Sequence, residues 1–480
     1  MFSGFDYGTS NCAMGIISPT QQANDTTTSK AQLKVQPKTQ PRVQLLALEQ
    51  NKAFMPSTLY ALERELICEQ VGLAIQPAEL KQEFLSLRSN SLAQARRIRQ
   101  QEGLDASEQT LFFGRAAFEE YYEFPEEGYF VKSPKSFLGA SGLRPEQVFF
   151  FEDIVTAMMQ NVKTQAEKSA AVQGLTDPIE HTVIGRPVNF QGLNAEQSNK
   201  QAIDILTVAA KRAGFKSVEF LFEPIAAGLN FESDLPEDKT VLVVDIGGGT
   251  TDCAMVRMGP NHKNKEQRQQ DFIGHSGERV GGNDLDIQLA GSCLMPLFGM
   301  GSDLKNGKPV STKTFWDAVA TNDISAQSNF NSLQTELYLD QLVRDSAAPE
   351  LIKRFIKLRD EKQNHHLVRT SEQCKIALSQ QASDCLDLSY IEQDLSETIT
   401  REMFAAAVNR PIERMAVLMD EAIQQAGCKP DLVYVTGGSG QSPAIRQAIK
   451  EKIGAVEVVD GDHFGSVASG LTVWAERLYR

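Results

Sequence analysis

Apolar positions recur along this chain with two different periods, and their alternation predicts an α/β protein. Short apolar runs at residues 43–48 and 181–184 have the composition of strands. Longer stretches at residues 148–174 and 195–213 repeat apolar positions at helical spacing, and each lies beside a predicted strand. Because strands and helices alternate in this way, we expect a largely parallel sheet.

A second half opens with another β-type apolar run, which begins at Val241. Residues 300–345 are polar and show no period, so we expect an inserted subdomain of irregular structure there. Helical patterning returns at residues 349–379 and 399–426, and Gly427 follows the latter helix as a C-terminal cap. The pattern therefore predicts more than one domain, with an insertion in the second half.

Two stretches near the N-terminus differ from the rest in composition. Residues 19–42 are rich in Gln, Thr, Pro and Ser and have no apolar period, which is typical of a flexible surface excursion. Residues 62–102 carry mostly helical patterning, with a basic cluster at Arg96, Arg97 and Arg99. We interpret this cluster as a solvated helix face and not as a binding patch.

Size, charge and composition limit the class of partner. The chain has 480 residues, which is enough for two or more domains with substantial cores. Its net charge is −14, and no Lys- and Arg-rich stretch is interleaved with aromatic residues, so nucleic acid and membrane are poor partner predictions. Neither a cleavable leader nor a long uncharged apolar run is seen, and we therefore expect a cytoplasmic protein.

The cysteines and histidines do not indicate a metal site. The seven cysteines are scattered and odd in number, so we interpret them as reduced thiols. Among the six histidines only His365 and His366 are adjacent, and no ligand lies at metal spacing from them.

Two glycine turns, one in each half of the chain, carry the same order of residue types. The first runs from Asp6 to Asn11 and the second from Asp245 to Asp252, and in each an aspartate is followed by glycine and hydroxyl residues. Glycine lets the backbone come close to phosphate oxygens, while main-chain N–H groups and hydroxyls donate hydrogen bonds to the anion. The groups predicted to bind phosphates are Gly8, Thr9, Ser10, Asn11, Gly247, Gly248, Gly249 and Thr250, with Thr251 as a further hydroxyl donor.

The aspartates of these turns require a cation beside the phosphates. A carboxylate repels phosphate, so Asp6, Asp245 and Asp252 indicate a Mg²⁺ ion that keeps most of its waters between the two charges. A single turn of this kind is more often a plain hairpin, but two in one chain favour a nucleotide site.

A third glycine loop follows another apolar strand. Residues 433–440 end in Gly437, Gly438, Ser439 and Gly440, which we predict to contact the nucleotide. The next residues, Ser442 and Pro443, predict a serine N-cap with proline at the first helical position.

Together these residues resemble the ATPase domain of the Hsp70 chaperones, within the actin, Hsp70 and sugar kinase superfamily. The turns resemble the family's two phosphate motifs, and residues 182–190 resemble the strand and proline turn before the first lobe-connecting helix. Residues 223–229 match that helix, in which Ala226, Ala227 and Gly228 would let two helices cross closely.

The resemblance implies a two-lobed actin-like ATPase, built from duplicated ribonuclease-H-like domains with a cleft between them. We expect residues 1–235 with 459–480 to form lobe I, and residues 236–458 to form lobe II with an inserted subdomain at about 294–400. The pattern is similar to the YegD-type branch, so we expect the nucleotide-binding part alone, without the linker and the peptide-binding β-domain.

The resemblance also implies roles for individual residues. Residues 133–139 resemble the segment with the family's catalytic lysine, and Lys135 would offset charge on the γ-phosphoryl group. Glu223 would orient or deprotonate the attacking water, with Thr250 and Asp245 completing the catalytic set. Without the resemblance, Lys135 is an ordinary loop lysine.

A helix further along matches the family's ribose-binding helix. Glu372, Lys375 and Ser379 share one face by their spacing, although a solvated face with one salt bridge would look the same. The two arginines that sandwich adenine in Hsp70 proteins are replaced here by Ile376 and Gln441, which weakens the prediction of base preference. We assign no role to Asp462.

The sequence therefore predicts a protein that binds ATP or ADP with Mg²⁺, hydrolyses ATP slowly to ADP and phosphate, and switches lobe closure. A chaperone-like or regulatory role would add a protein client or co-chaperone as partner. Two alternatives stay open. One is a nucleotide-sensing scaffold or filament former with little hydrolysis; the other is a small-molecule kinase that uses one of the aspartates as base, although no separate sugar-binding motif is seen.

Overall fold

The structure is a computed structural model, and it describes residues 1–18, 43–125, 127–190, 194–232, 235–263, 265, 268–461 and 465–480. The excursion predicted for residues 19–42 and the residue Asp462 lie outside this part of the chain. No helix within the described ranges combines the length and apolar character needed to cross a bilayer.

The first half is built on a mixed sheet with strand order β3-β2-β1-β8-β9, to which β4 is added beside β2. β1 pairs antiparallel with β2 and parallel with β8, and β8 pairs parallel with β9. The predicted strand at residues 43–48 is shorter than expected, because β3 ends at Leu45. The strands of this first sheet are β1 (Phe2–Tyr7), β2 (Asn11–Ile17), β3 (Val43–Leu45), β4 (Met55–Pro56), β8 (His181–Arg186) and β9 (Ser217–Phe222).

The second half repeats this plan with strand order β12-β11-β10-β15-β16. β10 pairs antiparallel with β11 and parallel with β15, as β1 does with β2 and β8. Each glycine turn is therefore the hairpin connection between the first two strands of a sheet. The strands of this sheet are β10 (Lys239–Ile246), β11 (Thr251–Met258), β12 (Phe272–Glu278), β15 (Leu432–Thr436) and β16 (Glu457–Asp460).

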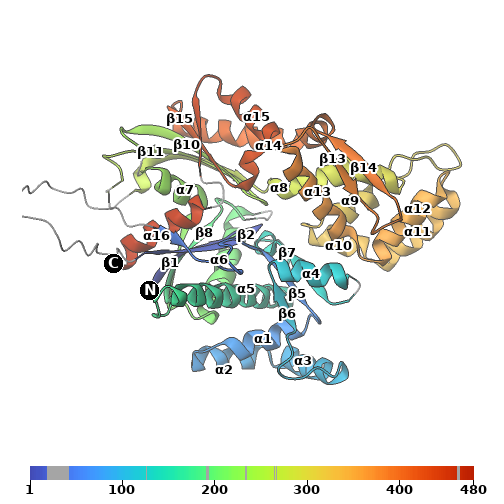
Figure 1. Cartoon of the computed structure of the whole chain (residues 1–480), viewed down its shortest axis with the longest axis horizontal. Coiled ribbons are helices and arrows are strands. Elements are labelled where there is room, and N and C mark those ends of the chain that lie inside the picture. The colour runs from blue at the N-terminus through green and yellow to red at the C-terminus, as the bar shows by residue number, and fades with distance from the viewer. Residues whose placement is uncertain are drawn as a thin grey trace, which may run out of the picture.

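Helices cover both sheets (Figure 1). α5 (Pro145–Val172) and α6 (Ala195–Arg212) lie together on the first sheet, close to the predicted ranges. α14 (Arg401–Ala426) packs on β12 of the second sheet and ends at Gly427, which has φ +66° as expected for a C-terminal cap. α15 (Pro443–Ile453) follows the third glycine loop.

The helices α7 (Glu223–Glu232) and α16 (Ser466–Tyr479) cross between the two sheets. A Cβ added at Gly470 of α16 would lie 1.7 Å from the carbonyl oxygen of Ala226, so the backbones touch directly. Ala226 and Ala227 are fully buried, which agrees with a close crossing. Gly228 plays a different part from the one predicted, because its Cβ would instead meet Met258 Cε of the adjacent sheet at 2.3 Å.

Three apolar clusters hold these layers together. One large cluster fills the first half and another the second half. The third contains Val183, Val243 and Leu471, and it joins the two sheets through the crossing helices. The two halves thus share a buried core where α7 and α16 cross.

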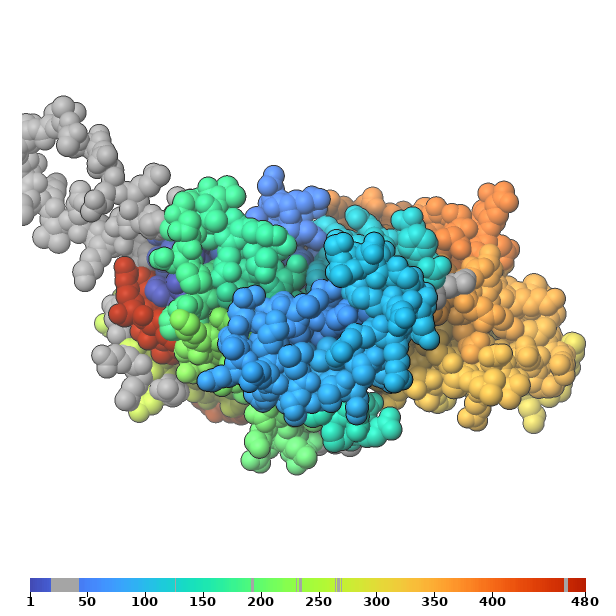
Figure 2. All heavy atoms as spheres, turned by 90° about the horizontal axis from the view of Figure 1, so that it is seen from below, coloured from blue at the N-terminus to red at the C-terminus, as the bar shows by residue number. Residues whose placement is uncertain are grey.

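Smaller elements extend each half away from this core (Figures 1 and 2). In the first half, β5, β6 and β7 form a three-stranded sheet in the order β6-β5-β7. Figure 2 shows the blue helices α1 to α3 on the near face and the yellow and orange second-half helices at one end. The first-half elements are β5 (Thr58–Ala61), α1 (Leu66–Ala74), α2 (Ala78–Leu87), α3 (Ser89–Gln101), β6 (Leu111–Phe113), α4 (Arg115–Glu123) and β7 (Tyr129–Lys132).

The prediction of irregular structure at residues 300–345 is wrong. The segment contains α9 (Lys313–Val319), α10 (Ile324–Phe330) and α11 (Leu333–Asp345). α9 and α10 have only seven residues each, so the apolar period is too short to recognise, although Phe315 and Phe330 are buried.

The helical run predicted at residues 349–379 is two helices. α12 (Pro349–Asp360) and α13 (Asn364–Leu378) are separated by a turn in which Lys362 has φ +48°. α8 (Gly282–Leu289) lies beside α13, and β13 (Ser383–Asp387) with β14 (Ser396–Thr400) forms a hairpin next to it.

Candidate functional site

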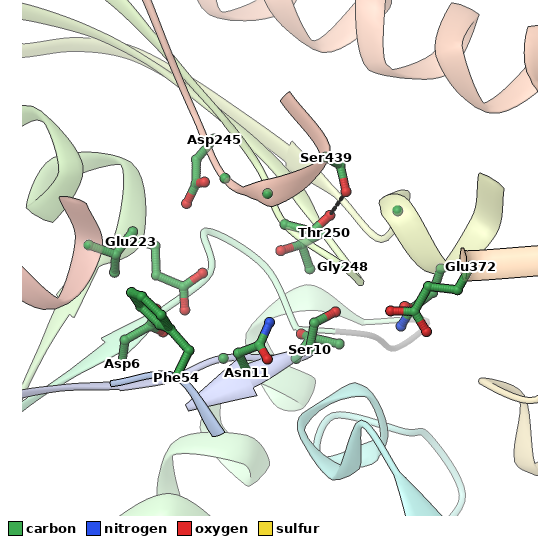
Figure 3. A pocket seen from close by; sticks show the side chains of 18 of the residues that line it. Asp6, Ser10, Asn11, Phe54, Glu223, Asp245, Gly248, Thr250, Glu372 and Ser439 are labelled. Atoms are coloured by element: carbon green, nitrogen blue, oxygen red, sulfur yellow. Dashed lines mark hydrogen bonds between the residues drawn. The ribbon is translucent and has the colours of Figure 1, made fainter. Parts of the chain in front are cut away.

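A cavity of about 230 Å³ lies where the two glycine turns face each other (Figure 3). A Cβ added at Gly248 would lie 1.7 Å from Ser10 Oγ, and one at Gly249 would lie 2.6 Å from Thr9 Cγ2. The turns of the two halves therefore touch, and a side chain at either glycine would displace Ser10 or Thr9. The residues of the turns that line the cavity are Asp6, Gly8, Thr9, Ser10, Asn11, Asp245, Gly247, Gly248 and Thr250.

The third glycine loop closes the same cavity from the second half. Gly437, Gly438 and Ser439 line the cavity, and Ser439 Oγ donates a hydrogen bond to Gly247 O at 3.1 Å (Figure 3). Gly437 has φ +80°, and its Cβ would meet Ile246 O at 2.3 Å, so glycine is required there. Gly440 is buried behind the loop and is not part of the cavity wall.

The helix start after this loop is placed as predicted, but the serine does not cap it. Ser442 stands at the N-cap position and Pro443 at the first helical position of α15. The Ser442 side chain makes no capping hydrogen bond, and its Oγ is buried without a partner among the described residues. The backbone φ of proline is therefore the local signal that begins this helix.

Carboxylates gather at one end of the cavity. Asp6 lies near the end of β1, Asp245 lies near the end of β10, and Glu223 begins α7, so three different elements direct acids to one place. Burial, followed by the charge of Glu223, raises the pKa of Asp6 to about 7 and that of Asp252 to about 7. The same two causes raise the pKa of Asp245 well above its ordinary value.

One ammonium group faces these acids. Lys135 is 4% exposed, forms an ion pair with Glu223, and lies 3.4 Å from Gly185 O. Burial by itself would lower the pKa of Lys135, but Glu223 and Asp6 raise it above the ordinary value. Lys135 lines a small cavity of about 20 Å³, together with Gly249 of the second turn. Thr9 and Thr250 line both this cavity and the main one, so the two cavities are adjacent. Four carboxylates thus surround one lysine.

This donor set fits a hydrated Mg²⁺ ion. Among the described residues, no group of three His, Cys, Asp or Glu side chains is arranged to hold a metal directly. Oxygen donors that repel one another when buried, as Asp6, Asp245 and Asp252 do, match a hard cation that keeps its waters. Asp252 is 1% exposed and its Oδ1 accepts a hydrogen bond from Val188 N at 2.8 Å, so it stands behind the cavity wall.

The other end of the cavity is formed by α13. Glu372 and Lys375 line the cavity, and each is already paired. Glu372 lies 2.9 Å from Lys132 of the first half and 2.8 Å from Arg369, and Lys375 lies 2.7 Å from Asp286. Burial would raise the pKa of Glu372, but Lys132 and Arg369 hold it well below its ordinary value.

The predicted site residue Ser379 is not brought into this cavity. It lies at the C-terminal cap of α13, where its Oγ donates to Lys375 O at 3.2 Å, and it lines a neighbouring cavity of about 270 Å³. Ile376 does line the main cavity and is 57% exposed, while Gln441 is exposed beside the third loop. The end of the site expected to meet the base therefore has an apolar side chain and an amide, and no arginine at either position.

Several wall residues were missed by sequence reasoning. Phe54 lies beside Asp6 and Asn11 (Figure 3), on a segment whose next residues pair with β2. Gly282 and Asn283 follow β12, and a Gly-Gly-Asn sequence after a strand was the available signal for them. Ser466 and Val467, at the start of α16, carry no local signal and also line the cavity.

The Phe54 segment is fixed to the first glycine turn. Ser57 N donates to Ser10 O at 2.8 Å, and Ser57 Oγ donates to Gly8 O at 2.7 Å. Arg115 Nη1 donates to Phe54 O at 3.1 Å from the start of α4. These hydrogen bonds fix the backbone around Phe54, so its ring is held at the carboxylate end of the cavity.

Comparison with known proteins gives one family. The family model described as "Hsp70 protein" matches residues 133–294 and 338–478, which together are more than half of the chain. The second glycine turn and the third loop lie inside the matched residues, whereas the first turn lies outside them. One curated relative, the chaperone protein DnaK of Guillardia theta, is 23% identical over 352 residues, which cover 71% of this chain and 44% of the relative. The chain thus spans less than half of the length of that relative.

Proposed function

The chain belongs to the Hsp70 family, and from this premise we propose that it binds ATP with Mg²⁺ in the cavity between the two glycine turns, hydrolyses it slowly, and switches between open and closed forms of the cleft. Hsp70 proteins generally bind ATP or ADP with Mg²⁺, and membership implies the two-lobed actin-like ATPase fold. One observation carries the proposal: two equivalent hairpin turns from duplicated sheets touch across one cavity, with the carboxylates of Asp6, Asp245 and Glu223 in its wall and the Lys135–Glu223 ion pair beside it.

The proposed lobes follow the two sheets. Lobe I would comprise residues 1–235 and the C-terminal helix α16, and lobe II would comprise the residues between, with the insertion at about 294–400. Because β16 pairs with β15 up to Asp460, we place the second boundary just after that residue, and not at 459.

The chemistry proposed for these groups is an in-line attack of water on the γ-phosphoryl group. Glu223 would orient the water and accept its proton, Lys135 would offset charge on the phosphoryl oxygens, and Thr250 would help to position the phosphoryl group. Main-chain N–H groups within residues 8–11 and 248–250 of the two turns would hold the phosphates, while the Gly247 N–H closes its own turn by donating to Thr250 O at 3.0 Å. A Mg²⁺ ion held through water by Asp6, Asp245 and Asp252 would neutralise phosphate charge.

Phosphate release by the purified protein tests the ATPase proposal. With saturating Mg²⁺ and ATP, we expect measurable release from the unmodified protein and at least a roughly 100-fold lower rate from Lys135→Ala and from Asp245→Asn. Lys163→Ala is a matched lysine control, because Lys163 pairs with Glu167 on α5, far along the chain from the cavity residues. Equal release by all four proteins would reject the proposal.

Calorimetry tests binding separately from hydrolysis. ATP, ADP and GTP would each be titrated with and without Mg²⁺. Tight binding of adenine nucleotides that depends on Mg²⁺ supports the proposal, and the GTP titration measures what the replacement of two arginines by Ile376 and Gln441 does to base choice.

A nucleotide-sensing scaffold or filament former is the second candidate, and one observation favours it. Glu223, the proposed base, is already in an ion pair with Lys135, and it would have to leave this pair to orient the attacking water. In that case ATP would bind tightly, phosphate release would be close to zero, and sedimentation would depend on the nucleotide.

The biological setting is part of the same proposal. A chaperone-like or regulatory role, with a protein client or co-chaperone as partner and a cytoplasmic location, is suggested by the family and by the DnaK relative. A small-molecule kinase of the same superfamily has no observation in its favour among the described cavity residues.

A further inference from the structure

Two adjacent histidines of α13 lie among aromatic side chains of the other half of the molecule. The His365 ring lies 5.9 Å from the Tyr121 ring and 5.5 Å from the Phe130 ring, edge to face in both cases. The His366 ring lies 4.4 Å from the Tyr122 ring and stacks on Tyr390 at 3.7 Å. We name the set His365, His366, Tyr121, Tyr122, Phe130 and Tyr390 the aromatic clasp.

The aromatic clasp joins elements that are far apart in the sequence. Tyr121 and Tyr122 belong to α4 and Phe130 to β7, which are first-half elements, while His365 and His366 belong to α13 of the second half. Tyr121 Oη also donates a hydrogen bond to Lys362 O at 2.5 Å, just before α13. The clasp is therefore a contact across the cleft.

Its place in the molecule makes this contact suited to hold the cleft closed. The same helix carries Glu372 and Lys375 into the cavity, one to three turns after the histidines. The halves are also joined by the crossing of α7 and α16, and Figure 1 shows these two helices on the left, away from α4 and α13 on the right. Separation of α4 from α13 would thus open the cavity while the crossing helices still hold the halves together.

The surroundings of the two rings favour their neutral forms. Burial lowers the pKa of His365 to about 4, with a further contribution from Lys132, and burial lowers the pKa of His366 to about 4. His365 Nδ1 is buried with no hydrogen-bond partner among the described residues, while His366 Nδ1 contacts Gln363 Oε1 at 3.1 Å.

The tyrosines of the clasp do not change charge in the acid range. Burial raises the pKa of Tyr122 to about 12, and burial also raises those of Tyr121 and Tyr390. The charged neighbours are Lys132 on β7, Lys362 before α13, and Arg369 and Glu372 on α13. Burial would raise the pKa of Glu372, but Lys132 and Arg369 hold it well below the ordinary value. Asp286 on α8, which pairs with Lys375, has its pKa raised to about 6 by burial and so titrates in this range as well. Within the clasp itself, His365 and His366 are the groups that titrate below pH 7.

We propose that the aromatic clasp keeps the cleft closed over bound nucleotide at neutral pH, and that protonation of His365 and His366 opens it and speeds nucleotide release. The inference rests on the proposed nucleotide site. It adds a pH response that comes from the contact between α4 and α13 and is separate from the raised pKa values of Asp6 and Asp252 in the site.

The direction and size follow from linkage. A histidine whose pKa is lowered in the closed form contributes to closure above about pH 6.5, and this contribution is lost as the pH falls toward 4. With an exposed histidine titrating near 6.5 and a closed one near 4, a fall from pH 7.5 to 5.5 favours the open form by about tenfold for each histidine. Two histidines that act together give up to about 100-fold.

The test is the release rate of a fluorescent ADP analogue, followed by stopped-flow dilution at pH 7.5 and 5.5. We expect release from the unmodified protein to be about 10- to 100-fold faster at pH 5.5. In the double variant His365→Phe, His366→Phe, which keeps aromatic rings but carries no titrating group, the change is expected to shrink to about twofold or less. His275→Phe is the matched control, because His275 is an exposed histidine on β12.

An acid response of equal size in the double variant would overturn the proposal, since the response would then come from carboxylates of the site. Should the double variant fail to fold, the single variant Tyr390→Leu serves, because it removes the ring stacked on His366. It is expected to speed release at pH 7.5 and to reduce the acid response, and unchanged kinetics would count against the clasp.

Hydrogen exchange separates failure of this inference from failure of the proposed function. Amides of α4 and of residues 362–378 are expected to lose protection at pH 5.5 after correction for intrinsic rates, with no nucleotide present. If nucleotide does not bind, the proposed function fails while this readout still tests the clasp. Protection that is independent of pH would reject the clasp even where nucleotide binds.

Discussion

The two ends of the cavity differ in how their charges are balanced. At the end where the phosphates are proposed to bind, called the phosphate end below, Asp6, Asp245, Asp252 and Glu223 face one lysine, Lys135. Burial and mutual repulsion raise the pKa of the three aspartates there. At the α13 end, acids and bases alternate, with Glu372 between Lys132 and Arg369 and with Asp286 against Lys375.

This difference indicates what each end needs from a ligand. The phosphate end is short of positive charge, so a hydrated cation that arrives with the nucleotide would relieve repulsion that the empty protein contains. At the α13 end Glu372 is already paired with Lys132 and Arg369, so a sugar hydroxyl that binds Glu372 competes with Lys132. The first end is therefore expected to control chemistry and metal dependence, and the second to control affinity and opening.

The largest effect is expected from a matched pair of glutamate variants. Glu223→Gln removes the proposed base and should lower phosphate release by about 10²- to 10⁴-fold while nucleotide still binds. Glu372→Gln keeps the shape at the other end and should weaken nucleotide binding only several-fold, with little change in the maximal rate. Steady-state rates with calorimetric affinities measure both, and similar rate losses in the two variants would remove the distinction between the ends.

The next prediction concerns stability at the paired end. Asp286 is 1% exposed, so Asp286→Asn leaves Lys375 without its buried partner and should lower the free energy of unfolding by about 3 kcal/mol. Urea denaturation of the protein without nucleotide measures it. Glu167→Gln, which breaks the more exposed pair with Lys163, is the control and should cost less than about 1 kcal/mol.

The unbalanced end is expected to respond in the opposite direction. Asp245→Asn removes one of several repelling buried charges, so the free energy of unfolding should rise by about 1 kcal/mol even as metal-dependent ATP binding is lost. A loss of stability in urea like that of Asp286→Asn would mean that both ends are internally balanced in the empty protein.

The smallest effect is expected where the base would lie. Ile376→Arg restores one planar cation at an exposed position and should tighten ATP binding by about 1 kcal/mol, or about fivefold. Ile376→Lys adds the same charge without a planar group and should give a smaller gain. Equal gains for both would mean that added charge, and not stacking on the base, is responsible.

Much of the fold and site can be read from local sequence because their causes are local. The glycine turns are recognisable since a close backbone approach excludes side chains, and the structure shows Gly248 and Gly249 in contact with Ser10 and Thr9. The helices at residues 145–172 and 195–212 are long enough to show their apolar period. The seven-residue helices α9 and α10 are too short, and residues 300–345 were therefore predicted wrongly.

The sequence by itself determined which residue types could meet a phosphate, since glycine, hydroxyl and carboxylate groups act through chemistry that each carries alone. The tertiary structure alone decided that Phe54 and Val467 enter the cavity wall, that Ser379 does not, and that two adjacent histidines meet tyrosines from the other half. These contacts join residues separated by tens to hundreds of positions, and no local pattern encodes them. Only the packing of two separate cores on shared helices brings such residues together.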